Sequence, residues 1–224
     1  MSAGISLALS GSNVTGDAPF SCALRLASGE VHESPPAIGR RDLAALVADL
    51  CARHVVRPDQ LTELRLDLGP GSYTGLRVAV TFVRFLQRFG DLPVLAVDSL
   101  TLLAASAREV EPRPTRLLPL LDARRGRFHL GVLSQAHDGA LSLLQPPQAL
   151  PLASVLAAIR PGDLSVMPQS VDTQVGAEVR ASGAVIHRAS GITAKQLFAG
   201  GLPFVRSAWQ DLEPHYLMGS YAES

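Results

Sequence analysis

Polar and apolar residues alternate over residues 63–68, and this period of two is typical of a strand with one buried face. From residue 76 to residue 89 the apolar positions recur at helical spacing instead. Three glycines and a proline stand between the two patterns, in residues 69–75. The pattern predicts a strand, a tight turn and a helix, and we take this segment as the centre of the chain.

The turn has two readings. Glycine suits a backbone that turns sharply or approaches another group closely, and the hydroxyl of Ser72 or Thr74 can cap the helix. Free amides at a helix start attract anions such as phosphate, so the candidate nucleotide or anion contacts are Gly69, Gly71, Ser72, Thr74 and Gly75. No Gly-Lys-Ser/Thr follows, so the turn is not a P-loop. A turn that needs glycine only for packing is the alternative.

The helix after the turn carries more apolar surface than one face requires. Its two apolar stripes are Leu76, Ala79, Val83 and Leu86, and Val78, Phe82, Phe85 and Phe89. Burying both inside a small chain is difficult, so we expect one stripe to meet the sheet and part of the other to meet a partner. The alternative is a helix deep inside the core.

A second amphipathic helix is predicted over residues 41–54. Its apolar face consists of Leu43, Leu46, Val47, Leu50 and Cys51. A third helix, capped by Asp98 or Ser99, is expected to run to about Val110. Two prolines follow, at positions 112 and 114, and they exclude helix and central strand alike. We therefore expect one lobe over residues 1–110 and a smaller lobe over residues 111–224, with the chain's tail folding back.

Apolar runs and turn residues outline the remaining elements. Short strands are predicted over residues 5–9, 21–27, 30–33, 116–121, 127–133, 164–167 and 184–187. Helices are predicted up to residue 159 and over residues 192–199. The prolines at positions 146, 147 and 151 favour a loop over residues 145–151.

The predicted hairpin of residues 116–133 has a charged tip. Arg124, Arg125 and Arg127 form a small basic cluster there, beside Asp122. One reading is a solvated turn. The other is contact with phosphate or with an acidic partner surface.

Composition narrows the function classes. The 224 residues carry 20 basic and 20 acidic side chains, and this neutrality argues against nucleic acid as a partner of the chain alone. No apolar run is long enough to span a membrane, and the first ten residues show no signal peptide, which favours the cytoplasm. Cys22 and Cys51 lack metal-ligand spacing and are expected to be free, buried thiols.

Candidate catalytic groups are few. Ser72 occupies a tight turn before a helix, but no base can be assigned to it and the Gly-x-Ser-x-Gly elbow is absent. None of the six histidines lies four residues from another, so no metal site is predicted. The sequence therefore predicts no catalytic residue.

A family resemblance adds to this reading. Residues 69–78, Gly-Pro-Gly-Ser-Tyr-Thr-Gly-Leu-Arg-Val, resemble the Gly-x-Gly-Ser-Phe-Thr-Gly-Val-Arg signature of the TsaB (YeaZ) family. Residues 93–100 resemble the strand and Ser-Leu turn that follow in the family, residues 121–126 its Asp-Ala-Arg turn, and residues 214–217 its Pro-x-Tyr-Leu segment. The family's first strand usually ends in an aspartate, whereas this chain has Leu9 and Ser10 there, with Asp17 the nearest acid. Leucine offers no ligand to magnesium, so ATP hydrolysis by this chain is not expected.

The resemblance implies an α/β fold with two lobes of actin-like ATPase (ribonuclease-H-like) type, each a mixed sheet flanked by helices. It implies a non-catalytic scaffold subunit of the complex that forms N6-threonylcarbamoyladenosine next to the anticodon of tRNAs. Such a subunit would dimerise with the catalytic homologue TsaD or with a second copy of itself. It would help to recruit the ATPase TsaE and meet tRNA only through the complex.

The resemblance also implies that the chain has no cofactor of its own, with ATP and Mg²⁺ only at a shared interface. The expected partner-binding residues are Leu43, Leu46, Val47, Leu50, Val78, Phe82, Phe85 and Phe89. The alternative is a stand-alone, ATP-dependent phosphotransferase or acyltransferase of actin-like fold, with ATP at residues 69–75.

Overall fold

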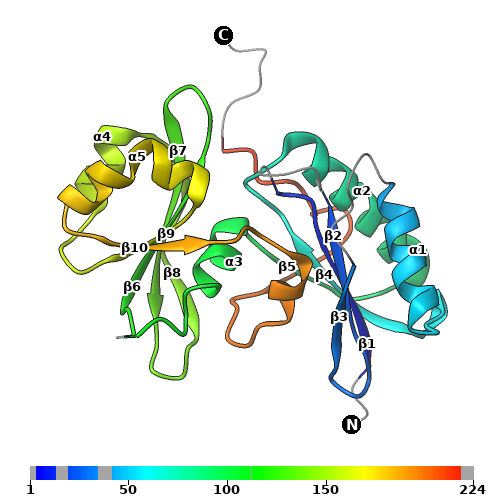
Figure 1. Cartoon of the computed structure of the whole chain (residues 1–224). Helices are drawn as coiled ribbons and strands as arrows, with labels where there is room; N and C mark the ends of the chain where they lie inside the picture. Colours follow the sequence, from blue (N-terminus) through cyan, green and yellow to red (C-terminus); the bar gives the residue numbers. More distant parts are fainter. Residues whose placement is uncertain (1–3, 14–19, 35–41, 112, 218–224) are drawn as a thin grey trace. The chain divides into compact units, whose positions relative to one another are not determined.

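The computed structural model describes residues 4–13, 20–34, 42–111 and 113–217, and its contacts divide the chain into two units (Figure 1). The first unit contains residues 1–99, 192–199 and 204–215, and the second contains residues 100–191, 200–203 and 216–224. The division therefore falls between residues 99 and 100 and not at residue 110, where we had placed it, because the contacts of residues 100–110 group them with the second unit. The segment 204–215 returns to the first unit, as a tail that folds back would.

A six-stranded mixed sheet forms the centre of the first unit. Its strands are β1 (Ile5–Ser10), β2 (Ser21–Arg25), β3 (Val31–Glu33), β4 (Leu61–Asp67), β5 (Val94–Val97) and β11 (Val205–Ser207). Their spatial order is β11-β5-β4-β1-β2-β3, with β1, β4 and β5 parallel and the other three strands antiparallel to their neighbours. The carboxyl ends of β1, β4 and β5 therefore meet at one edge.

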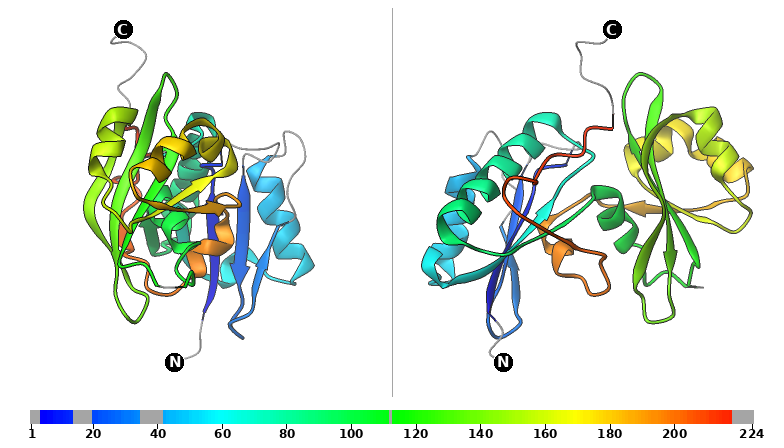
Figure 2. Two further views of the ribbon diagram at one scale, coloured as in Figure 1. Left: turned by 60° about the vertical axis from the view of Figure 1, so that its left-hand side comes forward. Right: turned by 180° about the vertical axis from the view of Figure 1, so that it is seen from behind.

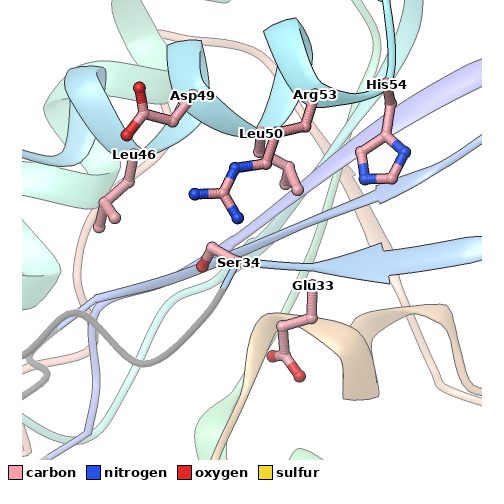
Figure 3. A pocket seen from close by; sticks show the side chains of 7 residues that line it. All are labelled: Glu33, Ser34, Leu46, Asp49, Leu50, Arg53 and His54. Carbon is pink, nitrogen blue, oxygen red and sulfur yellow. The ribbon is translucent and has the colours of Figure 1, made fainter.

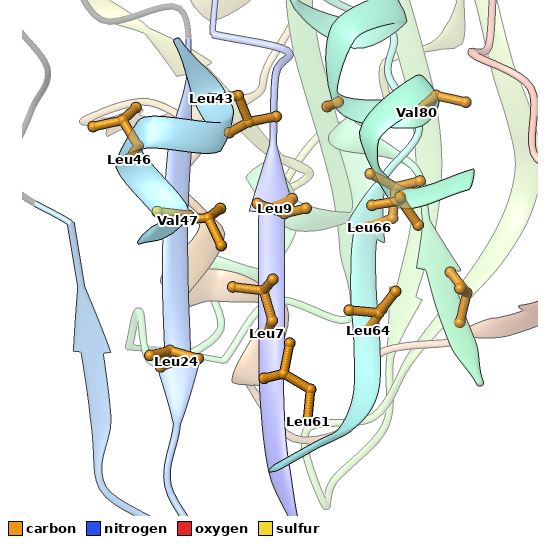
Figure 4. Packing of buried hydrophobic residues seen from close by; sticks show 14 of the residues in the cluster. Leu7, Leu9, Leu24, Leu43, Leu46, Val47, Leu61, Leu64, Leu66 and Val80 are labelled. Atoms are coloured by element: carbon orange, nitrogen blue, oxygen red, sulfur yellow. The ribbon is translucent and has the colours of Figure 1, made fainter. Parts of the chain in front are cut away.

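Two helices cover one face of this sheet, α1 (Leu43–Arg53) and α2 (Tyr73–Gly90), and they lie on the same side in every view (Figures 1 and 2). Leucines that alternate along the strands, such as Leu7 and Leu64, point into the layer beneath these helices (Figure 4). The short 3-10 helix η2 (Ala194–Phe198) lies against strands β1 to β4, and another, η1 (Pro58–Gln60), precedes β4. The strand alternation seen in the sequence thus becomes the core of this unit.

The second unit contains a five-stranded sheet. Its strands are β6 (Arg116–Asp122), β7 (Arg127–Gln135), β8 (Leu141–Pro151), β9 (Leu164–Pro168) and β10 (Val185–Ala189). Their order is β10-β9-β6-β7-β8, and β6, β9 and β10 are parallel. Helices α4 (Leu152–Ala158) and α5 (Gln169–Ala181) share an apolar cluster with β6 and β7, and α3 (Ser99–Ala105) begins at the boundary between the units.

The two units repeat one topology. The order β3-β2-β1-β4-β5 in the first corresponds to β8-β7-β6-β9-β10 in the second, and α1 and α2 occupy the chain positions of α4 and α5. The predicted α/β class, with two mixed sheets flanked by helices, is confirmed.

Five segments differ from the prediction. Residues 145–151 are not a loop but part of the long edge strand β8. Its pairing with β7 shifts register around the two prolines, and an edge strand tolerates proline because its outer N–H groups need no partner in the sheet. The helix expected up to Val110 ends at Ala105 and continues as hydrogen-bonded turns. The helix expected over residues 192–199 is the 3-10 helix η2. Finally, α5 and β11 were not predicted.

The side chain of Asp42 caps α1, accepting a hydrogen bond from the amide of Ala44 at 3.0 Å; the sequence analysis did not single it out. The prediction that Cys22 and Cys51 are free and buried is confirmed. Burial raises the pKa of the Cys22 thiol to about 11, so this thiol stays protonated in the core. Asp17, named above as the nearest acid to the first strand, lies outside the described residues.

Candidate functional site

The glycine-rich turn joins β4 to α2 at the edge where the parallel strands end. Gly69 has φ = +95°, a conformation that favours glycine. Ser72 is the N-cap of α2, and its hydroxyl accepts a hydrogen bond from the amide of Gly75 at 3.3 Å. Of the two capping residues that the sequence offered, the structure uses Ser72.

Two further glycines allow this turn to press against the loop that follows β1. A Cβ added to Gly71 would lie 2.5 Å from the side chain of Ser12, and one added to Gly11 would lie 2.5 Å from the carbonyl carbon of Gly75. Real Cβ atoms do not approach other atoms so closely. The amide of Ser72 also donates to the carbonyl oxygen of Ser12 at 3.1 Å. The two loops are therefore in backbone contact.

Asp67, at the end of β4, holds these loops together from inside. Its carboxylate is fully buried and accepts hydrogen bonds from the hydroxyls of Ser10 at 2.7 Å and Ser99 at 2.5 Å, and from that of Ser12. It also accepts one from the amide of Gly69 at 3.0 Å. Donors from the ends of β1, β4 and β5 thus converge on one negative charge.

This arrangement bears on the candidate anion contacts. The amides of Gly69, Ser72 and Gly75 already donate to acceptors of the chain itself. An anion at this place would also meet the negative charge of Asp67 in a poorly screened environment. The observed geometry favours the packing explanation of the glycine-rich turn for these three residues.

The sequence analysis did not single out Asp67, although a signal for it was present. Asp67 is an acid at the end of an alternating strand, two residues before a glycine turn, where it contributes nothing to an apolar core. Ser10 and Ser12 lie at the corresponding end of the first strand. Parallel pairing of β1 with β4 brings these residues together, and this pairing is known only from the tertiary structure.

Helix α2 presents an apolar band to solvent. Phe85 is 60% exposed, Phe89 is 76% exposed and Val78 is 38% exposed. The rings of Phe85 and Phe89 are in contact, with their centroids 4.7 Å apart. Phe82 instead packs partly buried against the core. Within the second stripe, Phe82 is therefore the aromatic residue that faces inward.

Charge along α2 has one sign. The helix contains Arg77, Arg84 and Arg88 and no acidic residue. Arg77 lies over the ring of Tyr73, 5.3 Å from its centroid, and donates to the Tyr73 hydroxyl at 2.9 Å. Arg88 lies 5.3 Å from the centroid of the Trp209 ring. Basic side chains thus accompany the exposed apolar band along the helix.

The apolar face of α1 corrects part of the expected partner surface. Four residues of this face were expected to bind a partner, but they are 1% to 8% exposed and pack in the core beneath the helix: Leu43, Leu46 and Val47 (Figure 4), and Leu50. They are needed to cover the sheet, so they are not at the surface for a partner. Of the eight residues expected there, Val78, Phe85 and Phe89 are exposed, and Phe82 is partly so.

A small hollow lies between α1 and the end of β3 (Figure 3). Its volume is about 110 Å³, and its walls are Glu33, Ser34, Leu46, Asp49, Leu50, Arg53 and His54. Pockets for nucleotides or drug-sized ligands are about 300–1,000 Å³. This hollow is too small for a nucleotide, and acidic and basic groups mix in its lining.

The described ranges contain no group of three or more His, Cys, Asp or Glu side chains that could hold a metal ion. In the same ranges, no helix has the length and apolar character needed to cross a membrane.

Known proteins resemble this chain in both sequence and structure. The family model for TsaD, tRNA N6-adenosine threonylcarbamoyltransferase, matches residues 40–165. The tRNA threonylcarbamoyladenosine biosynthesis protein TsaB of Bacillus subtilis is 36% identical over 118 residues, which are 53% of this chain and 50% of that protein. The protein of the same name from Haemophilus influenzae is 29% identical over 84 residues, 38% of this chain and 35% of that protein. The matched region thus spans about half the length of these curated relatives, or less.

Solved structures resemble the chain over nearly its whole length. YeaZ from Pseudomonas aeruginosa has a TM-score of 0.74 at 23% identity, covering 96% of this chain and all of that one. A second structure, of an uncharacterised Pseudomonas aeruginosa protein with similarity to peptidase YeaZ, has a TM-score of 0.75 with the same identity and coverage. At this identity the likeness shows the fold. The family model, which matches more than half of the chain, and the TsaB relatives show that the chain belongs to the TsaB (YeaZ) family.

Proposed function

We propose that this chain is a non-catalytic scaffold subunit of the complex that forms N6-threonylcarbamoyladenosine next to the anticodon of tRNAs. It dimerises with the catalytic homologue TsaD and helps to recruit the ATPase TsaE. The curated relatives, which are named as threonylcarbamoyladenosine biosynthesis proteins, support the pathway. The observation that carries the scaffold role is the exposed apolar band of α2.

The band is costly to leave in water. Fully burying a phenylalanine side chain contributes about 1.5–3 kcal/mol, and Phe85 and Phe89 are both mostly exposed. Their contact with each other protects only part of each ring. A partner that covers both rings therefore gains several kcal/mol of hydrophobic free energy, before the cost of association.

The basic side chains on α2 predict the charge of the partner's surface. Because the helix has three arginines and no acid, the complementary surface is an apolar groove with acidic residues at its rim. In the proposed scaffold role, this groove lies on the surface of TsaD. A second copy of this chain would occupy the same band in the absence of TsaD.

The glycine-rich turn supports a role without catalysis. The amides of Gly69, Ser72 and Gly75, three of the five residues expected to contact an anion, donate to acceptors of the chain itself, and the buried Asp67 lies beside them. In this proposal, ATP and Mg²⁺ bind at the interface shared with the partner. The family model, whose description names a transferase, supports the competing reading of catalysis by this chain alone.

The test of docking uses Phe85→Asp and Phe89→Asp with TsaD from the same organism. A charge on the band removes the contact but leaves the core intact, so each variant keeps its melting temperature and loses co-purification with TsaD. The matched control is Leu144→Asp on β8, where the leucine is 56% exposed in the other unit and binding is unchanged. Undiminished binding of both phenylalanine variants would contradict the docking face.

The absence of catalysis is tested separately. The purified chain alone, given threonylcarbamoyl-adenylate, ATP, Mg²⁺ and tRNA, forms no modified tRNA, whereas the chain combined with TsaD and TsaE does. In cells, replacing the wild-type chain with Phe85→Asp lowers the threonylcarbamoyladenosine content of tRNA, as measured by mass spectrometry. Transferase activity of the isolated chain, abolished by a point substitution within it, would establish the competing reading.

A further inference from the structure

The tip of the β6–β7 hairpin has an unusual backbone for its sequence. Arg124 has φ = +66°, Arg125 has φ = +53° and Gly126 has φ = +70°. The carbonyl oxygen of Arg124 accepts a hydrogen bond from the amide of Arg127 at 3.0 Å, which makes Arg125 and Gly126 the central residues of the turn. Positive φ at both central residues is the mark of the type I′ turn that suits a hairpin.

Arginine is a poor choice for a position with positive φ, which Arg124 adopts at the first residue of the turn and Arg125 adopts at its first central residue. A left-handed conformation brings the Cβ atom too close to the backbone, so such turns favour glycine, asparagine or aspartate. Two successive arginines are strained in this conformation, and asparagine would be less strained. Residues held in such conformations concentrate at functional sites, because a benefit outside local stability maintains them there.

The tip carries exposed arginines and one half-buried acid. Arg124 and Arg125 are both exposed, and the guanidinium of Arg127 donates to the carbonyl oxygen of Ala149 at 2.5 Å. The neighbouring acid, Asp122, accepts a hydrogen bond from the amide of Arg124 at 2.6 Å, so its carboxylate shapes the turn.

The sheet places further positive potential at the same end. Strand β9 runs parallel to β6, and α5 begins immediately after β9. The amino terminus of α5 therefore lies at the tip's end of the sheet and contributes the positive pole of its dipole. Arg113 and Arg160 precede β6 and β9, so they lie at the opposite end.

We propose that Arg124 and Arg125 contact adjacent phosphates of the tRNA backbone. A nucleic-acid strand offers successive negative charges at short spacing, which match two neighbouring guanidinium groups better than a single protein carboxylate does. The narrow hairpin tip presents both groups together. The identity of the RNA rests on the proposed function, whereas the phosphate contact rests on the tip itself.

The test replaces both arginines with the residue that the turn prefers, in Arg124→Asn/Arg125→Asn. Asparagine tolerates positive φ, so the variant folds with an equal or higher melting temperature while losing both charges. The matched control, Arg113→Asn/Arg160→Asn, removes the same charge from the opposite end of the same unit. Fluorescence anisotropy with labelled tRNA measures affinity over a salt series, for the chain alone at low salt and for its complex with TsaD and TsaE.

The tip variant is expected to bind tRNA about tenfold more weakly than the wild type, with the slope of log K against log salt reduced by about 2, or about 1 for each arginine. The control variant keeps wild-type affinity and slope. Arg124→Lys/Arg125→Lys, which keeps the charge, restores part of the affinity.

The proposal is overturned if the wild type, alone and in complex, binds tRNA no more tightly than the tip variant. It is also overturned if the tip variant loses TsaD or TsaE at unchanged tRNA affinity, because the tip then serves a protein partner. A different result would contradict the proposed function, namely unaltered TsaD binding by Phe85→Asp. The two outcomes can be told apart because Phe85 lies in the other unit.

Discussion

Gly11 and Gly75 touch through their backbones: a Cβ on Gly11 would lie 2.5 Å from the carbonyl carbon of Gly75. The loop after β1 and the first turn of α2 are therefore packed without room for a side chain between them. This contact fixes the start of the helix that carries the exposed aromatic band, so the packing of the loops and the docking surface are linked through α2.

Gly75→Ala is expected to destabilise the protein by about 2–3 kcal/mol, because a methyl group would collide with the backbone of Gly11, which cannot move aside cheaply. Urea denaturation followed by circular dichroism measures the change. Gly90→Ala is the control at the other end of α2, where the nearest atom to an added Cβ belongs to the Leu92 side chain at 3.4 Å. There, alanine is expected to be neutral or to stabilise by up to about 1 kcal/mol. Equal effects of the two substitutions would contradict the backbone contact.

Asp67→Ala is expected to cost about 3 kcal/mol or more, because it leaves three hydroxyls and the Gly69 amide without their shared acceptor in a buried place. The comparison is Asp59→Ala, which removes a carboxylate that is 68% exposed and pairs with the exposed Arg57 at 3.0 Å. Because water and salt screen an exposed pair of this kind, its removal is expected to change the free energy of unfolding little. The free energies of unfolding of the two variants are compared in urea, and a small loss for Asp67→Ala would show that the serine cluster does not depend on it.

His129 makes stability depend on pH. Burial lowers the pKa of its imidazole from 6.5 to about 4, against a smaller opposing effect of the Asp122 charge, and within the described part of the chain its Nδ1 has no hydrogen-bond partner. Above pH 6.5 this histidine is neutral in both the folded and the unfolded state. Between pH 6.5 and 4 the unfolded state binds the proton first, so the free energy of unfolding falls by about 3 kcal/mol over this window.

His129→Leu is expected to remove that fall, because leucine has no group to protonate. Unfolding in urea at pH 7, 6, 5 and 4 measures the profile. His137→Gln, at an exposed histidine, is the control and keeps the wild-type profile. A wild-type profile that matches His129→Leu throughout would show that His129 is not buried as described.

Two ion pairs in the second unit should differ in their contribution to stability. The Arg116 side chain is mostly buried, 13% exposed, beside the buried Asp163, whereas Arg180 is 48% exposed beside the buried Asp172. Within the described residues, Arg116→Met leaves the buried carboxylate of Asp163 with the Arg160 amide, at 2.7 Å, as its remaining partner, and should cost about 3–5 kcal/mol. Arg180→Met should cost about 1 kcal/mol or less, since Arg188 also pairs with Asp172. Urea denaturation measures the free energy of unfolding of both variants. A larger loss for Arg180→Met than for Arg116→Met would contradict the difference in burial.

Sequence patterns predicted the elements whose signal is local. The alternation before the glycine turn, the two stripes of α2 and the apolar face of α1 all appear in the structure, because strand and helix periods follow from backbone geometry. Segments decided by their neighbours were predicted wrongly. The prolines of β8 looked like a loop because their place at a sheet edge is set by pairing with β7. In α5, polar residues occupy much of the helix and conceal its valine stripe.

The sequence by itself determined the two-lobed α/β fold, the turn before α2 and an apolar excess on that helix. Only the tertiary structure decided which apolar residues remain exposed, because α1 turns its whole apolar face to the sheet while Phe85 and Phe89 point away from it. It also placed Asp67 among three serines and revealed the strained arginines of the β6–β7 tip. The physical reason is that burial, shared hydrogen bonds and backbone angles depend on contacts between segments far apart in the chain, which no local period records.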